Sequence, residues 1–357
     1  MDNYVTGKCM TMCPEEEIRI REKQKLLHIL EIVPGTEKDK IPKADRTRMV
    51  KEFSRSAAGK SLQNPKLIRP PEVLLHTIHY LFTEVATNDA VPWNITYDYI
   101  SDRLRSIRQD MIVQNATLVH TITLLQPIIR FYAYASFRLY GVDLNIFDNF
   151  LNNKHLLECL KRLLTVYDEY ELTKDDEHVF NDYLIKNRPQ FEALYVILNI
   201  GDQDAITRCL NLNQKWRTDI VEKALMLSLL YTRGNYVRYC RLIQDFPILL
   251  ALQASLHVPK LRRWALRVMS TAYSSKILKY PCKKMMEILL YYTIEDVTDD
   301  VNSFGMTVCE GAINFNKSLF KDPYDGKTNM DYRLEIRLEQ LEHKLMDIPI
   351  SKILLFN

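Results

Sequence analysis

The amino-acid sequence predicts an all-α fold: an irregular helical-repeat (TPR-like) superhelix followed by a C-terminal winged helix, with an extended N-terminal arm. Glycine is scarce, with nine residues among 357, which favours helices over glycine-rich nucleotide-binding or all-β folds. Apolar residues recur at helical spacing almost without pause from Pro71 to Ser275. The links between these helices are short, as they are in α-solenoids, although no strict repeat period emerges.

Composition and charge exclude several classes of protein. With 47% hydrophobic and 26% charged residues the chain is globular rather than disordered. The net charge of +3 is small, and the basic surplus lies within residues 1–70. Seven cysteines, five of them scattered singly, are typical of a reducing compartment. Neither a signal-peptide pattern nor a run of 18 apolar residues occurs, so we expect no membrane association and a location in nucleus and cytoplasm.

Residues 1–70 are predicted to form an N-terminal arm and a basic motif segment. A helix is expected over Glu15–Val33, because Pro14 precedes it and three glutamates occupy its first turn. A second, basic helix is expected within Arg46–Thr77, with Met49, Val50, Phe53 and two alanines on one side. Its small residues would let it act as a wedge packed into the larger domain, with the charges outside.

Residues 71–276 are predicted to be the helical-repeat domain. Periodicity and loop residues place its helices near residues 73–85, 97–113, 117–140, 146–168, 175–186, 189–200, 202–212, 217–232, 235–245, 247–256 and 259–276.

Residues 277–325 are predicted to be a winged-helix-like unit. Helices are expected at 281–292 and 294–303, followed by two strands at 306–308 and 312–315 with Gly311 in the turn. This order of elements is that of a winged helix. In the remaining segment, 326–357, a helix is expected with leucines at alternating four- and three-residue spacing, namely Leu334, Leu338, Leu341 and Leu345.

Catalytic and metal-binding motifs were weighed and rejected. Ala57–Ser61 (AAGKS) imitates the end of a P-loop, but Ser54 stands where the first glycine is required and no strand precedes it. Cys9 and Cys13 could form half a zinc site, yet no second Cys/His pair follows nearby. The eight histidines fit no catalytic pattern. We therefore expect no enzyme activity, no metal and no cofactor.

Basic residues gather near the predicted winged helix, interleaved with Tyr273 and Tyr280. Each cluster alone is usually a solvated face, but together they suggest non-specific phosphate contacts. The helix at 294–303 is acidic, which argues against major-groove readout of duplex DNA and leaves a protein partner as an alternative. The candidate nucleic-acid-binding residues are Arg262, Arg263, Arg267, Lys276, Lys279, Lys283, Lys284 and Lys317.

Several long motifs resemble the SAC/GANP family, the scaffolds of the TREX-two mRNA-export complex. They are GKCMTMCPEEEIRIRE (7–22), VKEFSRSAAGK (50–60), IRPPEVLLHTIHYL (68–81), YISDRLRSIRQD (99–110) and GNYVRYCRLI (234–243). The motif residues to which the resemblance assigns a structural role are Cys9, Met12, Cys13, Pro14, Phe53, Arg55, Ser56, Ala57, Gly59, Lys60, Arg69, Pro70, Asp102, Arg103, Arg105 and Arg108.

The resemblance implies a PCI module, in which helical repeats end in a winged helix. It also implies partners: a second PCI-domain protein, a small acidic Sem/DSS-type protein, and RNA on a basic winged-helix surface. The arm over residues 7–22 would wrap the helical domain, with Arg55 and Lys60 holding it.

Two functions follow as hypotheses. The first is a non-enzymatic scaffold that pairs with another PCI protein and contacts RNA in mRNA export or nuclear mRNA processing. The alternative is a centrosome duplication and spindle assembly factor that acts through centrosomal proteins without RNA. The alternative arises because the chain is most similar to the short SAC-domain members of animals.

Overall fold

The computed structural model describes residues 5–55, 64–172, 182–323, 345 and 347–355. They belong to two compact units: one contains residues 1–132, 158–184 and 350–357, and the other contains residues 133–157 and 185–349. Helices dominate, and the described residues contain only three short strands, so the all-α fold class is confirmed. No helix in these described ranges is long and apolar enough to cross a membrane.

The first helix is shorter than expected. α1 spans Glu15–Gln24 and ends at Lys25, whose φ of 57° is left-handed, and a short 3₁₀ turn, η1 (Ile29–Glu31), follows. Backbone N–H groups of Lys25 and Leu26 bond back to carbonyls of the last helical turn, which terminates the helix. The predicted helix over Glu15–Val33 is therefore wrong beyond Gln24.

The basic helix expected after Arg46 does not form in residues 46–55, which are turns and extended chain. Met49 and Val50 are adjacent and both fully buried. Carboxylates accept the hydrogen bonds of the backbone here: Glu17 accepts from the N–H of Glu52 at 2.8 Å. Tertiary contacts thus replace the helical ladder, as buried backbone groups require partners. Ser56, Ala57, Gly59 and Lys60 lie outside the described residues.

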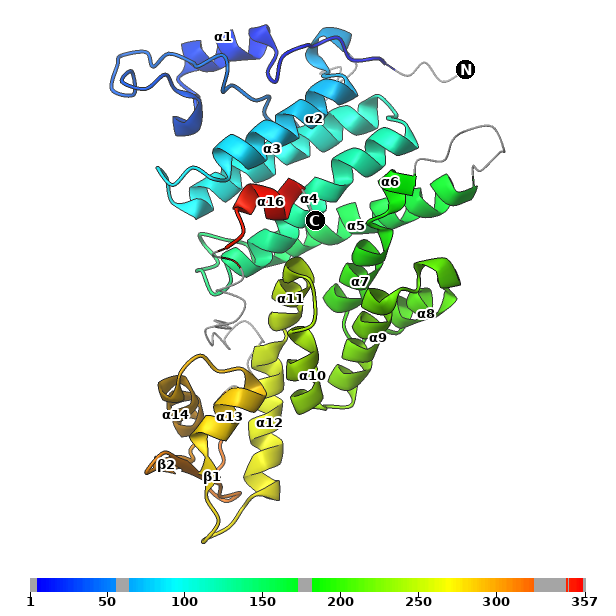
Figure 1. The fold of residues 1–357 in the computed structure, drawn as a ribbon. Helices are drawn as coiled ribbons and strands as arrows, with labels where there is room; N and C mark the ends of the chain where they lie inside the picture. The colour runs from blue at the N-terminus through cyan, green and yellow to red at the C-terminus, as the bar shows by residue number, and fades with distance from the viewer. Residues whose placement is uncertain (1–4, 56–63, 173–181, 324–344, 346, 356–357) are drawn as a thin grey trace. The chain divides into compact units, whose positions relative to one another are not determined.

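The first unit contains a layer of helices in which α2 lies against α3 (Figure 1). An aromatic stack fills its core, where the ring of Phe131 lies 5.5 Å from Phe82 and 5.9 Å from Tyr97. The short helix α16 packs against η3, a π-helical turn. The bounds are η2 Pro65–Leu67, α2 Pro71–Tyr80, η3 Leu81–Val85, α3 Trp93–Val113 and α16 Ile350–Leu355; α4 Leu118–Arg138, α5 Asn149–Leu172 and α6 Asp182–Ile185 contribute to both units.

The second unit begins its helical array with short antiparallel helices, close to where periodicity placed them. α9 packs on α7, α8 and α10, while α11 packs on α7. Side-chain hydrogen bonds to backbone carbonyls stabilise the array. The Tyr239 hydroxyl, for example, donates to the Ala254 carbonyl at 2.9 Å. The bounds are α7 Arg188–Leu198, α8 Gln203–Asn211, η4 Gln214–Trp216, α9 Asp219–Thr232, α10 Tyr236–Ile243 and α11 Ile248–Ser255.

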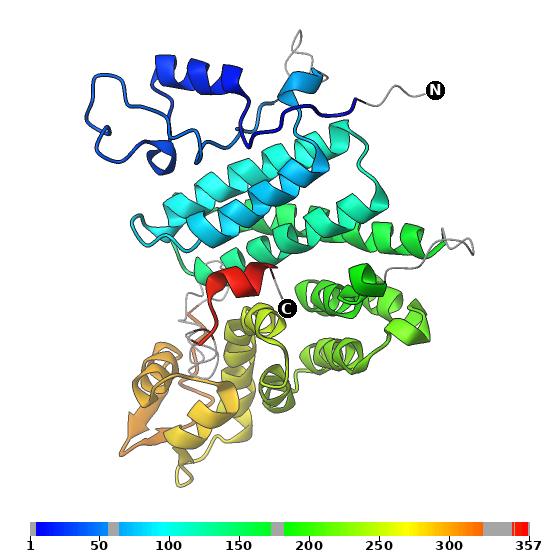
Figure 2. The same cartoon turned by 45° about the horizontal axis from the view of Figure 1, so that its top comes forward.

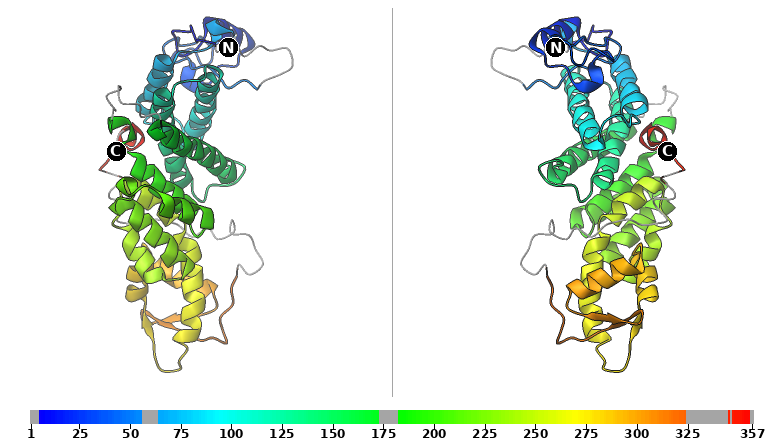
Figure 3. Two further views of the ribbon diagram at one scale, coloured as in Figure 1. Left: turned by 90° about the vertical axis from the view of Figure 1, so that its right-hand side faces the viewer. Right: turned by 90° about the vertical axis from the view of Figure 1, so that its left-hand side faces the viewer.

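The end of the second unit is a winged helix, which can be followed in Figures 1, 2 and 3. Its antiparallel sheet has the order β1-β3-β2, and Val308 pairs with Ile313 across the hairpin. Glu310 and Gly311 both have positive φ (53° and 72°), as a two-residue hairpin turn requires. The bounds are α12 Val258–Ala272, β1 Tyr280–Pro281, α13 Cys282–Leu289, α14 Ile294–Ser303, β2 Thr307–Cys309 and β3 Ala312–Asn314.

α12 belongs to the core of the winged helix. Ala265, Leu266 and Met269 of α12 pack into the same core as Leu289 and Phe304. The winged helix therefore begins at α12, inside the segment that the sequence assigned to the helical-repeat domain. β1 was not anticipated, because two residues directly before a helix carry no alternation that would reveal a strand.

Candidate functional site

The motif segments of the N-terminal part meet around Glu31, a carboxylate with no solvent exposure. Glu31 pairs with Arg21 of α1, and its Oε1 lies 3.2 Å from the guanidinium of Arg103. The same oxygen accepts from the Tyr99 hydroxyl at 3.0 Å and from the Val50 N–H at 3.2 Å. Three distant segments of the chain are thereby joined at one buried anion.

The pKa of Glu31 follows from this surrounding. Burial alone would raise it, but the charges of Arg103 and Arg21 and the N–H of Val50 together hold the pKa below its ordinary value. Glu31 is therefore a carboxylate at neutral pH. The adjacent Tyr99 hydroxyl shows the opposite: burial and the neighbouring Glu31 charge raise its pKa well above 10, so it remains a donor.

A second buried anion, Asp110 of α3, lies between two cations. Its Oδ2 accepts from Arg69 Nε at 2.7 Å, and its Oδ1 lies 2.6 Å from Lys51 Nζ. Arg69 also donates to the Ser106 hydroxyl at 2.9 Å and to the Met12 carbonyl at 3.2 Å. Asp110 thus connects the N-terminal arm, the segment at 51 and the segment before α2 to one helix.

The arm over residues 7–13 is held mainly through its backbone. The N–H of Cys9 donates to the Ile68 carbonyl at 2.9 Å, and the N–H of Gly7 donates to Gln114 Oε1 at 2.9 Å. A Cβ at Gly7 would lie 2.6 Å from the Ile68 carbonyl oxygen, so this close approach requires glycine. Arg55, expected to hold the arm, is exposed; the Arg69 guanidinium and the Lys51 backbone N–H instead donate to the Met12 carbonyl, at 3.2 and 3.0 Å.

The other motif residues also make structural contacts. The guanidinium of Arg105 lies 3.9 Å from the centre of the Phe53 ring. Asp102 pairs with Arg103 at 2.5 Å and accepts from the Phe53 N–H. Further contacts are Arg108 with Glu158 at 3.4 Å, Pro14 and Pro70 before the first residues of α1 and α2, and burial of Cys9 and Cys13.

Arg262 is the one predicted nucleic-acid-binding residue that is buried. It is 2% exposed, and its Nε donates to the Leu289 carbonyl at 2.9 Å while its other nitrogen reaches the Leu290 carbonyl. Its guanidinium also lies 3.9 Å from the centre of the Tyr291 ring. Arg262 therefore holds the end of α13, and it offers no charge to a ligand at the surface.

The next two arginines of α12 share one carboxylate. Arg263 Nε donates to Asp322 Oδ2 at 2.8 Å, and Arg267 donates to the same oxygen at 3.0 Å. Arg267 keeps half of its side chain in solvent, whereas that of Arg263 is 21% exposed. Their positive charge is partly neutralised within the winged helix.

The five lysines predicted to bind nucleic acid are all exposed on the winged helix, and we call this set the lysine surface. Two of them lie near carboxylates, Lys279 at 3.6 Å from Glu310 and Lys284 at 3.1 Å from Glu287. Two hydrogen bonds connect the segment after α12 to the segment after β3. The Ser274 hydroxyl accepts from the Lys317 N–H, and the Phe315 carbonyl accepts from the Ser275 N–H. Tyr273 is half-exposed, and its ring lies 5.3 Å from that of Tyr280. The lysine surface consists of Lys276, Lys279, Lys283, Lys284 and Lys317.

Comparison with known proteins decides the family. The SAC3/GANP family profile matches residues 12–310, which include the two buried anions and almost all of the winged helix. The chain belongs to the SAC3/GANP family.

Curated SAC3/GANP relatives come from distant eukaryotes. The chain is 28% identical to SAC3 family protein 1 of Schizosaccharomyces pombe over 99% of its own length and 35% of that protein. It is 25% identical to Protein xmas of Drosophila melanogaster and to SAC3 family protein B of Arabidopsis thaliana. These alignments cover 86% and 74% of this chain but 15% of each relative. The chain thus spans about a third or less of these relatives.

The SAC3/GANP family is a family of scaffolds. The motif residues of this chain make structural contacts. Its arginines and carboxylates neutralise one another inside the protein. Among the described residues, no group of three or more His, Cys, Asp or Glu side chains is arranged to hold a metal. Burial raises the pKa of the Cys13 thiol, so this cysteine is a protonated core residue.

The sequence did not single out four residues of this SAC3/GANP network: Arg21, Glu31, Glu52 and Asp110. Arg21, Glu52 and Asp110 lie inside the quoted motifs, so the motif spacing carried a signal for them. Glu31 had none, because a charged residue near the end of an expected helix is read as a surface position.

Proposed function

We propose that this SAC3/GANP chain is a non-enzymatic scaffold that pairs with another PCI-domain protein and contacts RNA through its lysine surface, in mRNA export or nuclear mRNA processing. A small acidic Sem/DSS-type protein would complete the assembly. The observation that carries the proposal is the lysine surface on a winged helix, in a chain that belongs to a scaffold family.

The chemistry of the lysine surface supports contact with phosphates rather than with bases. Lysine ammonium groups bind phosphates as point charges, and such binding depends steeply on salt. Half-exposed Tyr273 and its neighbour Tyr280 offer aromatic rings beside these charges, as single-strand binders do. α14, the helix that would enter a major groove, carries Glu295 and Asp299 on its exposed side and favours a protein partner instead.

Charge reversal on α13 tests the RNA contact. We expect Lys283→Glu/Lys284→Glu to weaken binding of a single-stranded RNA at least about tenfold and to reduce the slope of log K against log salt by about 1. Lys154→Glu/Lys161→Glu on α5 is the matched control, since both lysines are exposed and the change in net charge is the same. Equal losses in the two variants would leave only a general charge effect and overturn the contact.

Affinity purification from the protein's own cells tests the partner. We expect a PCI-domain protein and a small acidic companion in stoichiometric amounts. Recovery of centrosomal or spindle proteins without a PCI partner would overturn the proposal and favour the centrosomal function.

A further inference from the structure

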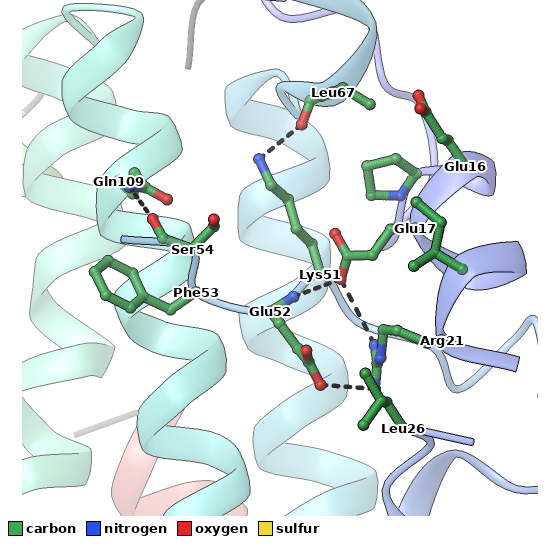
Figure 4. A pocket seen from close by; sticks show the side chains of 12 residues that line it. Glu16, Glu17, Arg21, Leu26, Lys51, Glu52, Phe53, Ser54, Leu67 and Gln109 are labelled. Carbon is green, nitrogen blue, oxygen red and sulfur yellow. Dashed lines mark hydrogen bonds and ion pairs between the residues drawn. The ribbon is translucent and has the colours of Figure 1, made fainter. Parts of the chain in front are cut away.

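A pocket of about 460 Å³ lies in the first unit (Figure 4). Residues of α1 and the nearby Leu26 line one wall of the pocket, and the extended segment 51–54 lines another. Leu67 and Gln109 close the remaining side. The volume is within the range of sites that bind small ligands or a few side chains.

Part of the pocket wall is apolar. Ile20 and Leu26 line it and are 46% and 55% exposed. Pro14, Phe53 and Leu67 extend this wall. An occupant with an aliphatic portion would cover these groups and gain free energy from their removal from water.

The two cations that line the pocket already have partners. Arg21 pairs with Glu31 and donates to the Val50 carbonyl at 3.2 Å. Lys51 Nζ lies between Asp110 and the Leu67 carbonyl, at 2.6 and 2.7 Å. Their positive charge is therefore neutralised by buried partners, so it does not favour an anionic ligand.

The pocket lining contains three carboxylates and two cations. Glu17 and Glu52 both turn toward Arg21 (Figure 4), at 3.6 and 3.1 Å, and Glu52 also lies 3.1 Å from Arg103. Burial, its largest influence, raises the pKa of Glu17 despite the N–H of Glu52 and the charge of Arg21. Glu16 adds a third, exposed carboxylate at the rim. With three carboxylates against two cations, the lining has a formal surplus of negative charge, and a further cation would lower the cost of ionising Glu17.

An unused acceptor lies among the pocket-lining residues. Gln109 donates through Nε2 to the Ser54 carbonyl at 2.8 Å, which fixes the orientation of its amide. Its Oε1 is buried and has no hydrogen-bond partner among the residues that the structure describes. This oxygen has no exposed surface that a ligand could reach, so Gln109 contributes to the pocket as part of its wall.

We propose that this pocket binds an arginine side chain, flanked by apolar residues, from a segment of a partner protein. The aliphatic stem of the arginine would lie on the wall formed by Ile20 and Leu26. Its guanidinium would meet the carboxylates with a planar fork of five N–H donors. The surplus of negative charge disfavours phosphates, so the occupant is a protein segment and not a nucleic acid.

Methyl NMR of the full chain tests the proposal with the probe N-acetyl-Leu-Arg-Leu-amide. We expect a saturable shift of the Ile20 methyl signal. The citrulline analogue has the same shape without the charge, and we expect it to bind at least about tenfold more weakly. Absence of a shift at millimolar peptide, or equal binding of the citrulline analogue, would overturn the proposal.

Two variants and their matched controls locate the site. Ile20→Ser and Glu16→Gln are expected to weaken peptide binding at least about fivefold, because each removes one part of the site. Leu75→Ser and Glu72→Gln change similarly exposed residues on α2 and should leave binding unchanged. Thermal unfolding checks that all four proteins fold; equal weakening by variants and controls would contradict the assignment.

RNA binding separates this proposal from the proposed function. The peptide-site variants leave the lysine surface intact, so their RNA affinity should equal that of the unmodified protein. Peptide binding that fails while RNA binding persists would refute the pocket alone.

Discussion

Arg69 and Asp110 form an ion pair of 2.7 Å in which neither side chain is more than 2% exposed. Lys51 approaches the other carboxylate oxygen at 2.6 Å. Such a cluster is stabilising only while it is complete, because each charge left alone in the interior keeps its full cost of desolvation.

Replacement of Asp110 by alanine should therefore destabilise the first unit strongly. Two cations would lose their buried partner, and we expect a loss of about 3–5 kcal/mol in the free energy of unfolding. Urea denaturation followed by circular dichroism measures it. Glu15→Ala is the control, since Glu15 pairs with Arg46 and Arg19 at the surface and should have little effect. Similar midpoints for the two variants would contradict a structural role for Asp110.

The second unit should lose stability on acidification because of His257. Burial lowers the pKa of His257 to about 4; its bond to the Ile197 carbonyl opposes this shift, and the charge of Lys260 adds to it. The folded state thus binds a proton less readily than the unfolded state, whose histidine titrates near 6.5. The contribution of His257 to the free energy of unfolding is therefore fully present above pH 6.5. It is lost as the pH falls toward 4, which lowers the free energy of unfolding by roughly 3 kcal/mol.

Unfolding of wild type and His257→Gln across this pH range measures the effect. The variant has no titrating ring, so its stability should fall less steeply between pH 6.5 and 4. Parallel curves for the two proteins would show that His257 is not the group responsible.

Arg262→Ala should unfold the winged helix more readily without a direct effect on RNA. The change removes hydrogen bonds to the Leu289 and Leu290 carbonyls and the stacking on Tyr291, so we expect a loss of about 2–4 kcal/mol. Thermal unfolding measures it, and Arg267→Ala, at a half-exposed position, should cost less than about 1 kcal/mol. A loss of RNA affinity at temperatures where the Arg262 variant is folded would argue against this purely structural role.

Gly234→Ala should lower the free energy of unfolding more than Gly141→Ala does. Both glycines have left-handed φ, of 66° and 78°, so alanine costs about 1 kcal/mol at either position. A Cβ at Gly234 would also lie 2.1 Å from the Trp264 ring, whereas nothing lies within 4 Å of one at Gly141. We expect about 1–3 kcal/mol of additional destabilisation at Gly234. A shift in tryptophan fluorescence confined to that variant would report displacement of the ring.

Elements whose residues determine their own structure were predictable from sequence. α14 begins and ends at Ile294 and Ser303 as expected, because Thr293 and Asp296 form a capping box at its start. The hairpin around Gly311 was also expected, since its turn needs positive φ. The exposed lysines of α13 could be listed from sequence as surface charges, and the structure leaves them exposed.

The segment around Val50 and the role of Arg262 could not be predicted in this way. Val50 and Phe53 recur at a helical interval, but their backbone N–H groups bond to Glu31 and Asp102, which lie 19 and 49 residues away. Arg262 reads as a surface cation beside Arg263, yet its partners are carbonyls of another helix. Long-range polar contacts leave no local periodicity, so pattern analysis cannot detect them.

The position of α16 against η3 has a consequence for synthesis. Ile353 and Leu354 are buried in a unit whose other parts lie before residue 185. At ordinary translation rates, roughly 10–50 s separate the appearance of η3 from that of α16 on the ribosome. During that time the second unit emerges, and the core of the nascent first unit lacks Ile353 and Leu354. A pause or early stop in translation before Ile350 would thus leave a chain that presents apolar surface to chaperones and proteases.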